Sequence, residues 1–280
     1  MKGKAPHLRK FISFLTKNSE CPYNVKHKVW KSALNSAVLY SCETWISNDF
    51  KILDTPYLTT LKQMLGVRST TCSDLIYIET GLPDVKSLII DRQIKYLKCL
   101  RTAHVDDYID KIIKMAIHHR TPMGRRLRYL ETLHANVRTQ CEMFSDTVSQ
   151  RVLHSNTSRR QLYLLMNPSL EAHTSINSLK PSNPKNHIKE VHRISLTRMR
   201  LGSHHLRIET GRWSRTPREN RTCQCQESIQ TEQHVLLHCS LSRTIRNNMN
   251  IKAASLTELF YTENVAEYCY RILNYYRTLH

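Results

Sequence analysis

The residues with the clearest capacity for chemistry are a compact group of cysteines and one histidine near the C-terminal end. Cys223 and Cys225 are separated by one residue, and His234 and Cys239 follow in the pattern C-x-C-x8-H-x4-C. Structural zinc sites hold the metal with four tetrahedral thiolate or imidazole ligands. The spacing predicts a structural Zn²⁺ site, with the first pair in a tight turn and the second pair at the start of a helix. Since protein ligands fill all four positions, the metal has no open position for catalysis.

Two alternatives to this ligand set remain open in the sequence. His238 competes with His234, but it directly precedes Cys239, and neighbouring residues on a helix point about 100° apart, which favours His234. The other alternative is that His234 and Cys239 face an apolar core while the two earlier cysteines are loop thiols. The other cysteines are scattered singly, as expected of reduced thiols in an intracellular chain.

The chain of 280 residues is strongly basic. Lys and Arg number 42 against 23 Asp and Glu, which gives a formal net charge of +19. Such a charge predicts a polyanionic partner, either nucleic acid or an anionic membrane surface. Glycine occurs only 6 times, too few for the glycine-rich loops of a Rossmann domain or a P-loop. RNA and/or DNA is the favoured partner, and neither a membrane nor a small-molecule substrate is predicted as a partner.

A basic stretch at residues 193–221 directly precedes the Cys/His group. Arginine dominates over lysine here, and its guanidinium group binds phosphate through two nitrogens and stacks on bases. Trp213 can stack a base, although a lone tryptophan more often anchors a core, and arginine-rich helices are often only solvated faces. The candidate nucleic-acid contacts are Arg198, Arg200, Arg207, Arg212, Trp213, Arg215, Arg218 and Arg221.

Carboxylates that would support nuclease or polymerase chemistry are not clustered in this sequence. That chemistry uses several carboxylates around two metal ions, yet Asp146 is the last aspartate of the chain. The Asp-Asp pair Asp106-Asp107 precedes an amphipathic segment and is expected in the first turn of a helix, where the helix dipole favours acidic residues. No catalytic residue is predicted, so the chain is expected not to be an enzyme by itself.

Hydrophobic periodicity favours a mainly α-helical fold. Apolar residues recur at i, i+3, i+4 and i+7 in the first half of the chain and again at residues 265–276. Pro56 is expected to start one helix. Gly81 is a helix stop signal and predicts another helix over about 73–80.

The expected organisation is a helical bundle, a linker and a small zinc-stabilised helical module. Residues 1–166 form the helical region, residues 167–187 are a linker rich in Pro, Ser and Asn, and residues 188–280 carry the basic stretch and the Cys/His group. The apolar runs are far shorter than the roughly 20 residues of a membrane-spanning helix, and the basic first residues exclude a secretory signal. An intracellular location, in the nucleus or the cytoplasm, is expected.

Two groups of motifs resemble one protein family. The first comprises A-V-L-Y-S-C-E-T-W at 37–45, L-K-Q-M-L-G-V at 61–67 and E-T-G-L-P at 79–83, and the second is T-E-Q-H-V-L-L-H-C at 231–239. Their order resembles the part of non-LTR (LINE-type) retrotransposon reverse transcriptases that follows the catalytic palm. There the first group belongs to the thumb and the second to a C-terminal CCHC segment. Ser41 stands where the family usually has glycine.

This resemblance implies a bundle that grips a template–primer duplex and a zinc-binding segment that holds RNA or DNA. It gives a metal-ligand role to Cys223, Cys225, His234 and Cys239 and a catalytic role to no residue, since nothing here matches the family's palm or endonuclease. The expected function is that of a non-catalytic nucleic-acid-binding C-terminal fragment of such a reverse transcriptase. The alternatives are a piece of an active RNA-directed DNA polymerase, a zinc-stabilised protein-interaction module and a translated relic without selected function.

Overall fold

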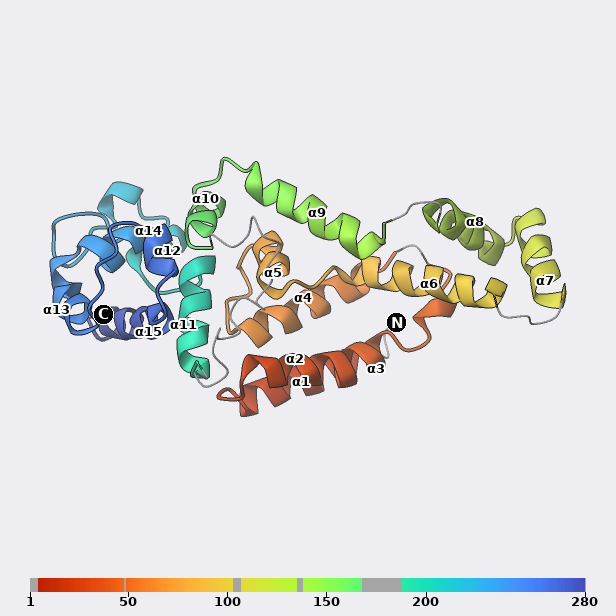
Figure 1. Ribbon diagram of the computed structural model, residues 1–280, viewed down its shortest axis with the longest axis horizontal. Helices are drawn as coiled ribbons and strands as arrows, with labels where there is room; N and C mark the ends of the chain where they lie inside the picture. The colour runs from red at the N-terminus through yellow and green to blue at the C-terminus, as the bar shows by residue number, and fades with distance from the viewer. Residues whose placement is uncertain (1–4, 48, 103–106, 135–137, 168–187, 280) are drawn as a thin grey trace.

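The computed structural model describes residues 5–47, 49–102, 107–134, 138–167 and 188–279. Within these ranges the chain forms fifteen α-helices and no strand, and one isolated antiparallel bridge joins Thr222 to Ile229. The mainly α-helical fold predicted from periodicity is confirmed. Figure 1 shows an elongated molecule, with the C-terminal helices at one end and the N-terminal helices in the middle.

The first helices form an N-terminal body around one apolar core. They are α1 (Ala5–Lys17), α2 (Tyr23–Val29), α3 (Ser36–Val38), α4 (Lys51–Leu65), α5 (Ser73–Thr80) and α6 (Val85–Thr102), with a π-helical segment at Trp30–Asn35 and a 3₁₀ turn at Cys42–Thr44. Leu61, Met64, Leu65, Leu75 and Ile76 are fully buried in this core. Burial of each such side chain contributes about 1.5–3 kcal/mol relative to exposure.

The ends of α4 and α5 show where local sequence signals succeed and fail. α5 ends at Gly81, whose left-handed φ of 63° explains the predicted stop. α4 begins at Lys51, so the prediction that Pro56 starts this helix is wrong, and the proline lies inside it. Leu53 in the added turn and Phe50 directly before it are each 2% exposed. Their burial offsets the backbone hydrogen bond that proline cannot donate.

Ser41 occupies a backbone position that favours glycine. Its φ is 57°, in the left-handed region where a side chain is unfavourable. Its hydroxyl lies 3.2 Å from Thr44 Oγ1, and its carbonyl accepts a hydrogen bond from the Thr44 hydroxyl at 3.0 Å. These contacts hold a turn that glycine would adopt without strain.

A helical hairpin extends the molecule beyond the N-terminal body, and two further helices lead back along it (Figure 1). The hairpin consists of α7 (Asp107–His118) and α8 (Pro122–His134), and α9 (Gln140–Leu153) and α10 (Ser158–Leu165) follow. Ile90, Leu97, Ile113 and Leu130 form a separate small core between α6 and the hairpin. Helix α7 begins at the second residue of the Asp-Asp pair, and Asp106 lies outside the described residues.

The last helices form a C-terminal body with its own core. They are α11 (Glu190–Leu201), α12 (Arg207–Trp213), α13 (Arg243–Asn248), α14 (Leu256–Phe260) and α15 (Val265–Thr278), with a π-helical turn at His234–His238 and 3₁₀ turns at Arg218–Asn220 and Ser240–Ser242. Tyr268, Cys269, Ile272 and Tyr276 of α15 are fully buried against Leu236. The apolar face predicted for residues 265–276 is therefore confirmed.

A buried ion cluster joins α11 to the N-terminal body. Glu190 accepts hydrogen bonds from Lys26 Nζ at 2.8 Å and from the backbone N–H of Tyr23 at 3.1 Å. Arg193 Nη2 lies 2.8 Å from Glu190 Oε1 and also donates to the carbonyl of Leu65 at 3.3 Å. The three charged side chains are at most 6% exposed. Helix α11 therefore belongs to the C-terminal body and also binds the N-terminal body.

The predicted linker lies almost entirely in a part of the chain that the structure does not describe. All but the first residue of the predicted 167–187 linker lie outside the described residues, so the domain boundaries stay a prediction. Among the described helices, none is both long enough and apolar enough to cross a membrane.

Candidate metal centre and nucleic-acid interface

The predicted metal ligands converge in the C-terminal body. The sulfur atoms of Cys223, Cys225 and Cys239 and one ring nitrogen of His234 all lie within 4.8 Å of one another. Cys223 Sγ is 3.7 Å from Cys239 Sγ, and Cys225 Sγ is 3.2 Å from His234 Nε2. Sulfur and nitrogen ligands of one tetrahedral zinc ion lie roughly 3.5–3.8 Å apart. The four side chains can therefore hold a metal ion.

The first two ligands lie in a tight turn, as predicted. The backbone N–H of Cys223 donates to Ser228 at 2.7 Å, and the carbonyl of Cys223 accepts from Gln226 at 2.9 Å. Gln226 has a left-handed φ of 64°, which reverses the chain. The bridge between Thr222 and Ile229 closes the turn at its base. Both thiols of the C-x-C pair are thereby held near the other two ligands.

The second pair of ligands lies at the two ends of a π-helical turn rather than at the start of an α-helix. The turn spans His234–His238, and the backbone N–H of Cys239 donates to the carbonyl of His234 at 2.8 Å. This is the i→i+5 bond of a π-helix. Five residues of an α-helix advance about 1.4 turns, which would point the two side chains to different sides. The wider π-turn returns Cys239 to the side of His234.

Buried neighbours favour the metal-binding forms of Cys223 and His234, whereas burial and the two other thiols raise the pKa of Cys225 to about 12. The Tyr276 hydroxyl of α15 donates to Cys239 Sγ at 2.8 Å. Burial opposes ionisation of Cys223, but hydrogen bonds from the neighbouring thiols and Tyr276 outweigh it and lower the pKa of Cys223. Burial also lowers the pKa of His234. A neutral imidazole and ionised thiols are the forms that coordinate metal.

The competing histidine allows a direct test of the ligand set. His238 is exposed and lies outside the converging group, whereas His234 is buried within it. We expect His234→Ala to abolish metal binding and His238→Ala to leave about one metal ion per chain. Metal content of the purified chain, measured by atomic emission, checks this result. Metal lost from His238→Ala but kept by His234→Ala would reverse the assignment.

Two of the predicted nucleic-acid contacts are internal. Arg200 is 7% exposed, and its Nη1 lies 3.5 Å from Glu79 Oε1 of α5. The guanidinium group of Arg221 donates to the backbone carbonyls of Ile208 and Thr216 at distances between 2.7 and 2.9 Å. Both arginines therefore bind other parts of the chain, and we leave them out of the candidate surface.

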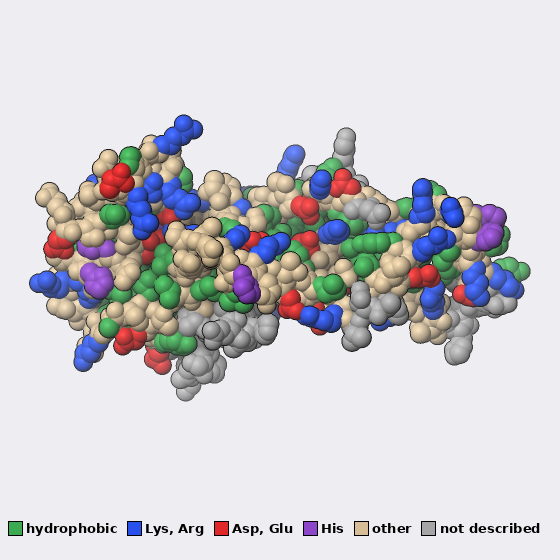
Figure 2. Space-filling view, turned by 90° about the horizontal axis from the view of Figure 1, so that it is seen from above, with side chains coloured by type: hydrophobic (Ala, Val, Ile, Leu, Met, Phe, Trp, Pro, Cys, Tyr) green, Lys and Arg blue, Asp and Glu red, His purple; other side chains and the backbone are tan. Residues whose placement is uncertain are grey.

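The remaining predicted contacts lie on the C-terminal body and are grouped as an arginine–tryptophan surface, in which Arg212 and Trp213 line one cavity together with Arg68. Trp213, at the end of α12, is 51% exposed and is therefore not a core anchor. The guanidinium carbon of Arg68 lies 3.8 Å from the centre of its ring. Figure 2 shows lysine and arginine side chains over this end of the molecule and also over the hairpin end. The other members of the surface are the exposed Arg198, Arg212, Arg215 and Arg218 and the half-buried Arg207.

Residues that sequence reasoning missed hold this surface in place. Arg68 follows α4 and has no local motif that marks it. Arg159 pairs with Glu209 of α12 and, at 2.7 Å, with Glu232. His204 Nε2 lies 2.9 Å from Glu232 Oε1. Burial opposes ionisation of Glu232, but His204 and Arg159 outweigh it and lower its pKa to about 2. This buried network fixes α12 against α10.

The metal centre and the arginine–tryptophan surface thus lie in the same body, and α11 attaches that body to the rest of the chain. No family model, no curated protein and no solved structure matches this chain.

Proposed function

We propose that the chain is a non-catalytic nucleic-acid-binding protein whose C-terminal body is organised by one structural zinc ion. The observation that carries the proposal is the exposed Trp213 with the Arg68 guanidinium group over its ring. Exposed aromatic rings stack on bases, and arginines around them bind phosphates. The net charge of +19 provides long-range attraction for a polyanion.

The proposed metal acts on the structure of the body and not on a substrate. Three thiolates and one imidazole suit zinc, and four protein ligands leave no open position. Since Cys239 also accepts the hydrogen bond from Tyr276 of α15, the ion would fasten the two ligand-bearing turns to the C-terminal helix.

The sequence resemblance to non-LTR retrotransposon reverse transcriptases supports the same proposal. The N-terminal body would correspond to the thumb and the C-terminal body to the CCHC segment. Polymerase activity would then belong to the catalytic palm of the family, and no residue of this sequence matches that palm. A piece of an active RNA-directed DNA polymerase is the alternative within this family.

A protein-interaction role is the second candidate, and it is favoured by the far hairpin. Tyr108, Ile112 and Met115 of α7 are 72%, 62% and 60% exposed. Exposed apolar side chains that lie together can mark a protein-interaction site. This candidate predicts nucleic-acid binding that is weak and insensitive to salt.

Trp213→Ala is expected to weaken nucleic-acid binding about 5- to 150-fold. The reason is that stacking of one base on an aromatic side chain contributes about 1–3 kcal/mol. Fluorescence anisotropy of a labelled RNA hairpin, whose loop offers unpaired bases, titrated with the full chain at two salt concentrations, measures the change. Affinity should fall steeply with salt, because bound phosphates release counterions.

The matched control is Tyr261→Ala, which removes another exposed aromatic side chain, 66% exposed, from the same body. It should leave the affinity unchanged. Equal affinities of the two variants, or binding that does not change with salt, would contradict the proposed function.

A further inference from the structure

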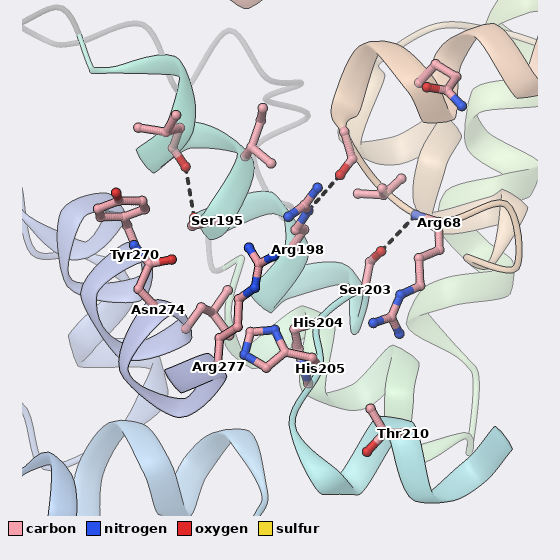
Figure 3. Close-up of a pocket in the computed structure, with 16 residues that line it drawn as sticks. Arg68, Ser195, Arg198, Ser203, His204, His205, Thr210, Tyr270, Asn274 and Arg277 are labelled. Carbon is pink, nitrogen blue, oxygen red and sulfur yellow. Dashed lines mark hydrogen bonds between the residues drawn. The ribbon is translucent and has the colours of Figure 1, made fainter. Parts of the chain in front are cut away.

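A polar groove lies where the C-terminal body meets the N-terminal body. Its volume is about 1030 Å³, and residues from α11, α15 and the segment after α4 line it. Figure 3 shows Arg198 and Arg277 pointing into the same space, with His205 beside them and Arg68 across from them. Of these four residues, the sequence identified only Arg198.

The groove carries positive charge without a matching negative charge. None of the residues that line it is acidic. Within the described part of the chain, neither Arg198 nor Arg277 forms an ion pair, and both side chains point into the same space (Figure 3). Two guanidinium groups held close together in this way repel each other unless an anion binds between them.

The donors in the groove suit a phosphate group. The Nε–H of Arg198 donates to the carbonyl of Gly66 at 2.7 Å, which fixes the side chain and leaves its terminal nitrogens for a ligand. One terminal nitrogen of Arg68 is buried and makes no hydrogen bond with any described residue. Thr210 and Asn274 add polar side chains to the lining. Planar guanidinium groups bind phosphate oxygens through paired nitrogens.

Arg68 links the groove to the exposed tryptophan. Arg68 lines the groove and also covers one face of Trp213, and a second, smaller cavity contains both residues. A nucleic-acid strand whose phosphates lie in the groove could therefore place one of its next bases against Trp213. A base can reach that ring only when it is unpaired, because the faces of paired bases are stacked inside a duplex.

We propose that this groove binds the phosphates of single-stranded RNA or DNA while one unpaired base stacks on Trp213. The inference rests on the proposed function and adds the strand form and the binding path. Arg277 and Arg198 are phosphate-binding residues in this scheme, and Arg68 connects the phosphate path to the base.

Arg277→Gln in the full chain tests this inference. The affinity for a labelled single-stranded oligonucleotide, measured by anisotropy on RNA and DNA of the same sequence, should fall at least about tenfold, since a hydrogen-bonded charge is lost. The dependence of log affinity on log salt should become shallower by about 0.7, the value for one phosphate of a single strand. Arg198→Gln should act in the same way.

The matched control is Arg271→Gln, because Arg271 lies on the same helix, is exposed and pairs with Glu267 at 2.6 Å. It removes the same charge and should change neither affinity nor salt dependence. If Arg277→Gln and Arg198→Gln bind single strands like Arg271→Gln while Trp213→Ala still weakens binding, the groove inference fails and the proposed function stands. Equal affinity for a duplex of the same sequence also overturns the inference, and a chain that binds no nucleic acid overturns the proposed function itself.

Discussion

Cys239→Ser is expected to remove bound zinc from the chain and to unfold its C-terminal body. Cys239 is fully buried, 3.7 Å from the sulfur of Cys223, and accepts the hydrogen bond of Tyr276. Structural zinc contributes roughly 10–16 kcal/mol of apparent binding free energy in small domains, as much as the whole stability of many proteins. Zinc measured by atomic emission should fall from about one per chain to none. Thermal unfolding, followed by circular dichroism, should begin at a lower temperature.

Substitution of two other cysteines distinguishes the effect of losing the metal from the effect of losing a thiol. Cys99 is exposed on α6, so Cys99→Ser should change neither zinc content nor unfolding. Cys269 is fully buried in the same core as the ligands but lies outside their group, so Cys269→Ala should lose some packing energy and keep its zinc. A chain purified without metal, or a Cys239→Ser variant that retains zinc, would rule out the metal centre.

Glu190→Ala is expected to destabilise the protein by about 3–5 kcal/mol. The substitution leaves Lys26 and Arg193 buried without their carboxylate, and an uncompensated buried charge costs about this amount. Because the cluster joins α11 to the N-terminal body, the two bodies should also separate more easily. The free energy of unfolding from urea titrations of the full chain measures the effect.

The surface pair Arg271–Glu267 is the reference for this prediction. Its side chains are 50% and 38% exposed, and exposed pairs contribute at most about 1 kcal/mol. Glu267→Ala should therefore change the free energy of unfolding little. If Glu190→Ala is no more destabilising than Glu267→Ala, the ion cluster does not hold the two bodies together.

Features that depend on neighbouring residues could be predicted from the sequence. The end of α5 follows from Gly81, and the buried face of α15 follows from the spacing of its apolar residues. The convergence of the Cys/His group also follows from spacing, since all four ligands lie within a short segment. That the bound metal is zinc, and that the surface binds nucleic acid, stay predictions.

Features that depend on contacts between distant segments could not be predicted. Glu190 and Lys26 form an ion pair although they are 164 residues apart in the sequence, and no local pattern marks either of them. The same is true of Arg68 above Trp213. Arg200 looks like its exposed neighbours in sequence, but its position on α11 turns it towards Glu79. Charge alone does not distinguish a ligand contact from an internal ion pair.

The π-helical turn at residues 234–238 also bears on how such a site changes during evolution. A π-turn holds one residue more than an α-turn between hydrogen-bonded groups, so it is equivalent to a single-residue insertion in a helix. Zinc sites tolerate spacings of three to five residues between paired ligands. Loss of one residue between His234 and Cys239 would then convert the π-turn to an α-turn, in which residues four apart lie on the same side, and leave both ligands in place.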